Sequence, residues 1–239
     1  MRLFDLETTP PIAVPHATYA ACDFSYGRAT PVHHIAAFGQ NLPLPAFLQQ
    51  AVPKRQAEFL AGRLCAHHAL ARLNRPTASI PAGEDRAPQW PAGYVGSITH
   101  SDTRAAAIVG HASRFSGLGI DHEEIMEPAL AEKLQRSILL PQETPLRPQS
   151  LTFAAFTSLV FSAKEALYKA TYPLIGKMFG FHDVALLRLT PTHLYFAMHA
   201  DTLPDWQLAV AYVLHPSHCE TLLALPASWP TPGGQNAPD

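Results

Sequence analysis

The order of predicted elements along the chain limits its fold more than any other feature. A helix followed by short strands occurs twice, first from residue 53 and again from residue 128. Strands that follow one another through short turns pair in antiparallel fashion, because a parallel pair needs a crossover of a dozen or more residues. The sequence therefore predicts the α+β class, with two similar halves that each consist of a small, mostly antiparallel sheet packed on helices.

Three stretches have the features of helices, and they cover residues 53–73, 128–139 and 151–172. The first begins at Pro53, which suits a first helical turn because its missing N–H is not needed there. The third is the longest, and we expect Pro173 to end it. Its apolar run is broken by Thr and Ser and is followed at once by Lys164 and Glu165, so it predicts a buried helix rather than a membrane span.

Short runs of strand-forming residues, bounded by Gly, Pro, Ser and Asp, predict the strands. They cover residues 94–99, 104–109, 118–123, 184–189, 193–199, 207–214 and 221–225. Residues 1–50 show little periodicity and predict an irregular wrap with short strands. We expect an N-terminal half at residues 1–117 and a C-terminal half at 118–239, whose tail from residue 226 is disordered.

Composition narrows the class of function. The 239 residues are 47% hydrophobic and carry a formal net charge of −2, which provides a sizeable core without the basic excess of a nucleic-acid-binding protein. Three scattered cysteines make no disulfide framework, and Asp5 and Glu7 stand where a signal peptide would be basic and then apolar. We expect a cytoplasmic monomer in which most of the 13 histidines are surface or structural residues.

The segment GIDHE at residues 119–123 is the first candidate for chemistry. Residues two apart on a strand face the same side, so Asp121 and Glu123 would share one face while His122 points away. Two such carboxylates can hold a hard cation such as Mg²⁺. A pair of this kind is also common at a solvated strand end, and spacing alone favours that second interpretation.

The segment FSAKEALYK at residues 161–169 is the second candidate. Glu165 and Lys169 are four residues apart and share a face of a helix with apolar flanks. They form either a weak surface salt bridge or a metal-binding carboxylate beside an ammonium group that grips phosphate. Spacing alone leaves both interpretations open.

Polar and basic residues of the first half could meet an anion. The segment GSITHS places Thr99 and His100 where a strand turns, and both side chains can donate hydrogen bonds to phosphate oxygens. Arg86 lies in a loop rich in Gly and Pro, while Arg55 and Arg63 are eight residues apart on the first predicted helix and point in similar directions. Taken singly, each is more often part of a polar turn or a solvated charge.

Together and in this order, these pieces resemble the Sfp-type 4′-phosphopantetheinyl transferases, and among them the enterobactin synthase component D group. The matching segments are KRQAEFLAGR at 54–63, GEDRAPQWP at 83–91, GSITHS at 96–101, GLGIDHE at 117–123 and FSAKEALYKA at 161–170. Many family members carry Trp where this chain has Phe161, and the form FS-x-KE is typical of the component D group.

The resemblance implies a fold of two similar α+β halves with the active site between them, and a role for each candidate residue. The implied ligands of Mg²⁺ are Asp121, Glu123 and Glu165, and the implied contacts of coenzyme A (CoA) are Arg55, Arg63, Arg86, Thr99, His100 and Lys169. Catalysis would depend on Glu165, Lys169 and His100, with Glu165 as general base. Glu143, in a predicted loop, is a second candidate for the base.

The implied reaction moves phosphopantetheine from CoA to a serine of an apo carrier protein and releases 3′,5′-ADP. The expected partners are CoA and an acyl, peptidyl or aryl carrier protein that docks near residues 139–158, and we expect no nucleic acid. Two alternatives use the same residues: a Mg²⁺-dependent hydrolase of CoA, and a CoA-binding module without turnover. The sequence leaves open which carrier is modified and whether Mg²⁺ or Mn²⁺ is preferred.

Overall fold

A computed structural model of the chain describes residues 1–27, 34–37, 40–75, 80–198 and 204–230. The chain divides into two compact units, Met1–Ala112 and Ser113–Asp239. Each unit is an antiparallel sheet packed against helices, so the predicted α+β class is confirmed. The division places the whole of strand β7 (Phe115–Glu124) in the second unit.

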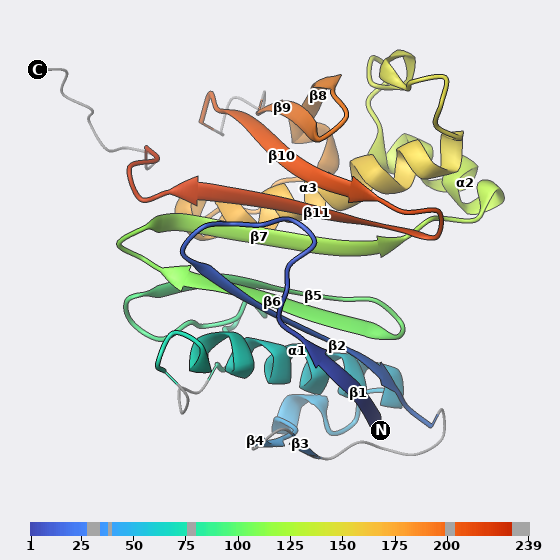
Figure 1. Cartoon of the computed structure of the whole chain (residues 1–239). Coiled ribbons are helices and arrows are strands. Elements are labelled where there is room, and N and C mark those ends of the chain that lie inside the picture. Colours follow the sequence, from blue (N-terminus) through green and yellow to red (C-terminus); the bar gives the residue numbers. More distant parts are fainter. Residues whose placement is uncertain (28–33, 38–39, 76–79, 199–203, 231–239) are drawn as a thin grey trace, which may run out of the picture. The chain divides into compact units, whose positions relative to one another are not determined.

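The first unit is a four-stranded antiparallel sheet with one long helix along one face (Figure 1). Its strands are β1 (Arg2–Glu7), β2 (Ala17–Ser25), β5 (Tyr94–His100) and β6 (Arg104–His111), in the spatial order β1-β2-β6-β5. Helix α1 (Pro53–Ala71) packs against β2, β5 and β6. A hairpin of β3 (His34–Ala37) and β4 (Gln40–Pro43) and a short 3₁₀ helix (Ala46–Leu48) precede α1.

The N-terminal region is more regular than predicted. Strand β2 is nine residues long and lies inside the sheet, paired with β1 on one side and β6 on the other. Its small residues Ala20 and Cys22 are buried in the core beneath α1, and the sulfur of Cys22 lies 3.6 Å from that of Cys65 on the helix. The expectation of an irregular wrap was wrong because small buried residues give a weaker strand pattern than Val or Ile.

The second unit is a five-stranded antiparallel sheet with one long helix on it and a second helix packed on the first (Figure 1). With β7 it contains β8 (Val184–Leu189), β9 (His193–Met198), β10 (Gln207–Leu214) and β11 (His218–Pro226), in the order β7-β11-β10-β9-β8. Helix α3 (Phe153–Ile175) packs on β7, β10 and β11, and α2 (Pro128–Ile138) packs on α3. Short 3₁₀ helices (Thr144–Leu146 and Phe181–Asp183) complete the unit.

Helix α3 runs past the proline that was expected to end it. Thr152 caps its first turn, where its hydroxyl oxygen accepts a hydrogen bond of 3.1 Å from the N–H of Ala155. Pro173 lies inside the helix, which continues to Ile175 and ends at Gly176 with a left-handed φ of 65°. Ile175 packs against the core, so tertiary contacts outweigh the proline's unfavourable helix propensity.

Two glycines of β7 allow α3 to lie directly on the strand. A Cβ atom at Gly117 would stand 2.2 Å from the carbonyl oxygen of Ala170, and one at Gly119 would stand 1.9 Å from that of Ala166. Glycine is required at both positions because any side chain would overlap the helix backbone. Since strand residues alternate between faces, the next residues on this face are Asp121 and Glu123.

The beginning of the expected disordered tail is ordered. Trp229 packs edge-on against Trp206, with ring centroids 5.7 Å apart, and its backbone N–H donates to the carbonyl oxygen of Pro226. Burial of a large aromatic ring outweighs the chain-breaking composition at this point. Residues 231–239 of the predicted tail, and residue 199 of the predicted strand 193–199, lie outside the described residues. In the described parts of the chain, every helix is too short or too polar to cross a membrane.

Candidate functional site

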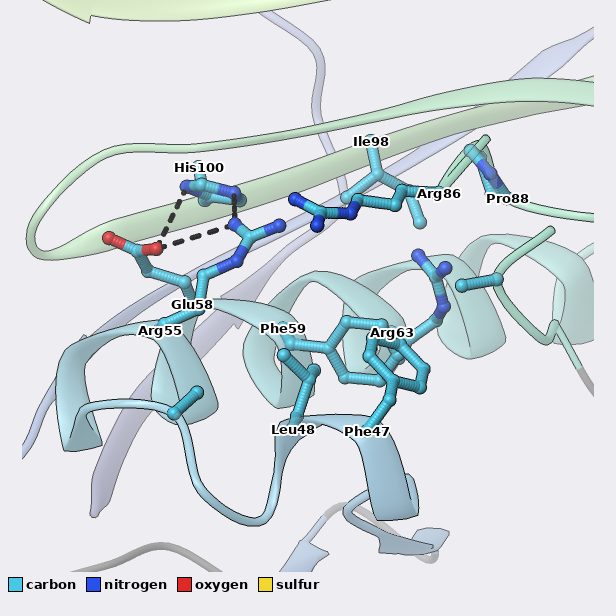
Figure 2. A pocket seen from close by; sticks show the side chains of 12 residues that line it. Phe47, Leu48, Arg55, Glu58, Phe59, Arg63, Arg86, Pro88, Ile98 and His100 are labelled. Atoms are coloured by element: carbon cyan, nitrogen blue, oxygen red, sulfur yellow. Dashed lines mark hydrogen bonds and ion pairs between the residues drawn. The ribbon is translucent and has the colours of Figure 1, made fainter. Parts of the chain in front are cut away.

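The first unit contains a pocket of about 350 Å³ lined by four of the predicted cationic side chains (Figure 2). We call it the basic pocket, and these residues are Arg55, Arg63, Arg86 and His100. They come from α1, from a loop and from the end of β5. The sequence predicted each of them separately as a contact of an anionic ligand, and the fold brings them together.

Helix α1 supplies two of the arginines from the same face. Arg63 is largely buried, and its guanidinium lies 4.6 Å from the ring centre of Phe59. Burial, with a smaller contribution from Arg55, lowers the pKa of Arg63 to about 10. Its buried Nε finds no acceptor among the residues that the structure describes. An unpaired buried donor of this kind favours an anionic ligand.

A tight loop presents Arg86 to the same pocket. Ala82 and Pro88 form an isolated bridge, Gly83 N–H donates to the carbonyl oxygen of Ala87, and Arg86 N–H donates back to that of Gly83. Arg86 itself has a φ of 69°, in the left-handed region that non-glycine residues seldom adopt. Backbone strain of this sort costs on the order of 1 kcal/mol or more and occurs often at ligand sites.

Glu58, a carboxylate that was not predicted from the sequence, contacts two of the residues that line the pocket. Glu58 Oε2 lies 3.5 Å from Arg55 Nη1 and 3.7 Å from His100 Nδ1, while Arg55 Nη1 lies 3.0 Å from His100 Nε2. Burial raises the pKa of Glu58, and the charges of Lys54 and Arg55 oppose that shift. The spacing of Glu58, three residues after Arg55 and four after Lys54, was the available signal.

Thr99 does not line the basic pocket, although it was predicted to contact CoA. Ile98 and His100, its neighbours on β5, do line it. Strand residues alternate between faces, so the side chain of Thr99 points to the opposite side, where it is buried. The basic pocket is thus lined by three guanidinium groups, an imidazole, one carboxylate and two aromatic rings. This lining suits a phosphate attached to an apolar or planar group.

The second unit holds the three predicted acidic residues, which we call the carboxylate trio. Asp121 and Glu123 lie on the face of β7 that carries Gly117 and Gly119, and Glu165 lies on α3, which packs against that face. The close contact at the two glycines therefore sets the position of the helix carboxylate relative to those of the strand.

The charges of the trio act on one another. Burial and the charge of Asp121 raise the pKa of Glu123 to about 7, and Glu165 adds to the shift. Burial also raises the pKa of Glu165, with Asp121 adding to the effect and Lys169 opposing it. Each pair of carboxylates repels, so the group favours a positive charge among its members.

Lys169 currently supplies positive charge to the trio. Its Nζ lies 2.6 Å from Asp121 Oδ1 and also donates to the carbonyl oxygen of Ile120. Among the described residues, the ligand atoms of the trio are more widely spaced than those of a second group in this unit, which all lie within 4.8 Å of one another. An oxygen-only donor set with mutual repulsion fits a hard divalent cation, which would replace the ammonium beside Asp121.

Glu143, the second candidate for the general base, is a structural residue. It is completely buried, pairs with Lys164 Nζ at 2.9 Å, and accepts hydrogen bonds from the N–H groups of Leu140 and Leu186. Lys164 donates further to backbone carbonyl oxygens, including that of Phe181. Because both carboxylate oxygens are engaged, Glu143 is unsuited to accept a proton from a substrate.

An apolar pocket of about 240 Å³ adjoins the carboxylate of Glu165. Tyr168, Phe179 and Phe181 line it, and Met178 at its edge is 83% exposed. The sequence did not predict this pocket because part of its lining, residues 178–181, follows α3 in a segment without periodicity. A slender, partly apolar chain is the kind of group that it can accept.

Comparison with known proteins assigns both units to one family. Residues 44–110 match the family described as the 4′-phosphopantetheinyl transferase N-terminal domain, and residues 117–228 match the 4′-phosphopantetheinyl transferase superfamily.

Three relatives illustrate the similarity. The chain is 40% identical over 136 residues to 4′-phosphopantetheinyl transferase Npt of Nocardia iowensis, a match that covers 57% of this chain and 60% of the relative. It is 37% identical over 145 residues to PptT of Mycobacterium tuberculosis, covering 59% and 63%. These two matches thus span about three fifths of each relative's length. Enterobactin synthase component D of Salmonella austin is 32% identical over 194 residues, which covers 79% of this chain and 80% of the relative. The chain therefore belongs to the 4′-phosphopantetheinyl transferase superfamily.

Proposed function

We propose that this chain transfers 4′-phosphopantetheine from CoA to a serine hydroxyl of a carrier protein and releases 3′,5′-ADP. The observation that carries the proposal is the carboxylate trio of Asp121, Glu123 and Glu165, whose members repel one another in a partly buried site of a chain from this family. Acidic groups without a bound cation would exclude an anionic substrate, so the reaction requires a divalent ion at this place.

The basic pocket supplies the recognition of CoA. The guanidinium groups of Arg55, Arg63 and Arg86 can pair with the oxygens of its 3′-phosphate, and Phe59 lies beside them for the adenine ring. The two ring nitrogens of His100 face Arg55 and Glu58, and an arriving phosphate would replace one of these contacts to accept a hydrogen bond from the imidazole. The three arginines bind and orient CoA, and His100 would also stabilise the charge that builds up during transfer.

Asp121, Glu123 and Glu165 would hold Mg²⁺, for which they offer a set of oxygen donors. When bound, the ion supplies Lewis-acid stabilisation of the charge that develops on the transferring phosphoryl group. Lys169, released from Asp121, can then pair its ammonium group with the diphosphate of CoA.

Glu165 is the proposed general base. The serine oxygen attacks the β-phosphorus of CoA, the bond from that phosphorus to the bridging oxygen of 3′,5′-ADP breaks, and the serine proton passes to the Glu165 carboxylate. The Glu165 carboxylate has two oxygens, so one can face the ion while the other accepts the serine proton. Glu143 does not serve as the base in this step, because its carboxylate is already paired with Lys164 and the N–H of Leu186.

The apolar pocket beside Glu165 would take the pantetheine arm. The arm carries a dimethyl group and two amides, which suit the rings of Tyr168, Phe179 and Phe181. The carrier would dock near residues 139–158, as predicted. Similarity to proteins named enterobactin synthase component D makes a siderophore-synthesis carrier the first candidate to test.

The test incubates the chain with CoA, Mg²⁺ and a panel of apo carriers, and then weighs each carrier by mass spectrometry. The expected result is a carrier that gains one phosphopantetheine group, together with one 3′,5′-ADP released for each group transferred. Release of 3′,5′-ADP without any carrier would indicate a hydrolase. Binding of CoA without turnover on any carrier would indicate a binding module, and either result would overturn the proposal.

A further inference from the structure

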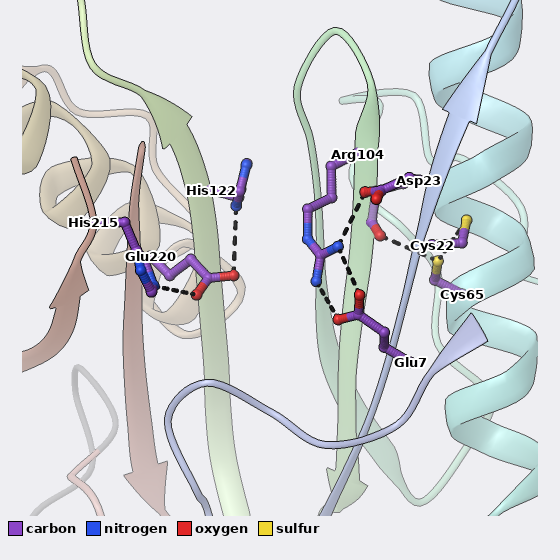
Figure 3. A network of polar contacts seen from close by, with 9 residues as sticks. Glu7, Cys22, Asp23, Cys65, Arg104, His122, His215 and Glu220 are labelled. Atoms are coloured by element: carbon purple, nitrogen blue, oxygen red, sulfur yellow. Dashed lines mark hydrogen bonds and ion pairs between the residues drawn. The ribbon is translucent and has the colours of Figure 1, made fainter. Parts of the chain in front are cut away.

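A second group of potential metal ligands lies on the opposite face of β7, away from the carboxylate trio. His122 stands between Asp121 and Glu123 in the sequence, so strand alternation directs its side chain to the other side of the sheet. Its ring meets the carboxylate of Glu220, which also faces His215 (Figure 3). The ring of His218 lies 4.8 Å from that of His122, centroid to centroid. We call His122, His215, His218 and Glu220 the histidine cluster.

Sheet register brings these four side chains to one face. Glu220 on β11 lies directly opposite His122 on β7. His218 precedes Glu220 by two residues and so shares its face. His215 and His218 flank the turn between β10 and β11, where His215 N–H donates to the carbonyl oxygen of His218 and the two rings stack with centroids 4.3 Å apart.

The distances are those of a group that can close on one ion. His122, His218 and Glu220 each offer a ligand atom, and these atoms all lie within 4.8 Å of one another. The two oxygens of Glu220 lie 3.5 Å from His122 Nδ1 and 3.8 Å from His215 Nε2. His218 Nδ1 lies 3.2 Å from the hydroxyl of Ser217, the type of outer contact that orients a metal-binding imidazole.

We propose that the histidine cluster binds a divalent transition metal ion, with Zn²⁺ as the natural occupant. Two or three imidazoles and one carboxylate form a donor set that suits Zn²⁺, whereas Mg²⁺ prefers oxygen ligands alone. The ligands come from β7 and from the β10–β11 hairpin, so the ion ties these segments together. It thereby stabilises the strand that carries Asp121 and Glu123 on its other face.

The sequence contains a signal for this site. The prediction that most histidines are surface or structural residues overlooked it. His215, His218 and Glu220 follow the spacing H-x₂-H-x-E at the end of a hairpin. The fourth member, His122, lies 93 residues before His215 in the sequence. The register of β7 against β11 brings it to the other three.

The proposal is tested by titrating the full chain with Zn²⁺ in a calorimeter, after any affinity tag has been removed and with Mg²⁺ in excess. The expected result is one bound Zn²⁺ per chain. His218→Gln and Glu220→Gln should each weaken zinc affinity at least about tenfold, since even outer contacts of a metal site contribute that much. His111→Gln, which alters an exposed histidine of the first unit, should leave zinc affinity unchanged.

A second readout separates a metal site from a merely structural polar network. Zn²⁺ should raise the melting temperature of the wild-type chain and of Asp121→Asn, because a ligand that binds only the folded state stabilises it. It should leave the melting temperature of His218→Gln unchanged. The proposal is overturned if the chain binds no Zn²⁺ in excess Mg²⁺, if His218→Gln binds it like wild type, or if Asp121→Asn abolishes the binding.

Discussion

The basic pocket of the first unit and the carboxylate trio of the second differ in charge and in how the chain builds them. Two of the pocket's arginines belong to one helix, and a strained loop adds a third. The trio joins a strand and a helix, and Glu165 lies 44 residues after Asp121 and 42 residues after Glu123. It depends on the close contact of α3 with Gly117 and Gly119.

The two sites also differ in what they need from a ligand. Glu58 offsets part of the positive charge in the pocket, so that site can form before an anion arrives. In the trio the ammonium of Lys169 pairs with Asp121, and burial together with the charge of Asp121 raises the pKa of Glu123 to about 7. We infer that the pocket is largely preorganised for CoA, whereas the trio reaches its working form only with a cation.

The largest expected effect comes from neutralising one member of the trio. Asp121→Asn and Glu165→Gln preserve shape but remove a charge, and each should lower kcat/KM for transfer at least about 100-fold, as loss of a key electrostatic group does. The melting temperature of metal-free Glu165→Gln should stay the same or rise, because burial disfavours the charge that is removed, whereas Asp121→Asn also loses the ion pair with Lys169 and should melt slightly lower. Carrier modification by mass spectrometry and thermal unfolding measure the two effects. Near wild-type activity in either variant would remove the trio from the site.

Gly119→Ala should damage the same site from a distance. The added Cβ would stand 1.9 Å from the carbonyl oxygen of Ala166, so α3 must move away from β7 and carry Glu165 with it. Overpacking of this kind costs about 1–3 kcal/mol of stability, and transfer activity should fall as well. Gly180→Ala is the matched control for stability, since its Cβ would meet only Asp183, at 3.8 Å. Equal melting temperatures for the two variants would contradict the packing argument.

Changes in the basic pocket should weaken CoA binding rather than slow the chemistry. Arg86→Ala should raise the KM for CoA by roughly 10–100-fold with kcat nearly unchanged, the effect of losing a hydrogen bond to a charged group. Arg86→Gly should have the same kinetic effect but a higher melting temperature than Arg86→Ala, because glycine relieves the φ of 69°.

A CoA analogue tests which phosphate Arg86 contacts. CoA that lacks the 3′-phosphate should bind wild type and the Arg86 variants about equally, since the contact that Arg86 makes is missing in every case. If the Arg86 variants weaken the binding of both substrates by the same factor, then Arg86 does not contact that phosphate.

The smallest expected effect is a pH dependence of cation binding. A proton on Glu123 competes with the metal below its pKa of about 7 and no longer competes above it, so apparent Mg²⁺ affinity should rise with pH. For one titrating carboxyl the change is about fourfold between about pH 6.5 and about pH 8. Calorimetry at several pH values measures it, with Glu123→Gln as the control that should lose the dependence. A flat profile in wild type would indicate that Glu123 is not a ligand.

Local pattern was enough to predict most of the fold. Proline at the start of α1 and α2, and the turn residues that bound β8 and β10, placed these elements almost as they are found. The signal failed where tertiary packing decides the outcome. Ala20 and Cys22 form a central strand because α1 covers them, and Trp229 orders its segment because Trp206 lies against it.

The candidate site was predictable only to the level of residue types. Alternation on β7 correctly put Asp121 and Glu123 on one face, and the same rule excludes Thr99 from the basic pocket. No sequence pattern distinguishes Glu143, which is buried against Lys164, from a carboxylate in an active site. Such distinctions depend on contacts between residues far apart in the chain.

The most direct test of the central claim is a titration with Mn²⁺, a paramagnetic substitute for Mg²⁺, followed by electron paramagnetic resonance in the presence of saturating Zn²⁺. We expect one Mn²⁺ per chain, displaced by Mg²⁺. The affinity for Mn²⁺ should be at least about tenfold weaker in Glu165→Gln and unchanged in His218→Gln. If Glu165→Gln binds Mn²⁺ as tightly as wild type, the strand and helix carboxylates do not share an ion, and the account is contradicted.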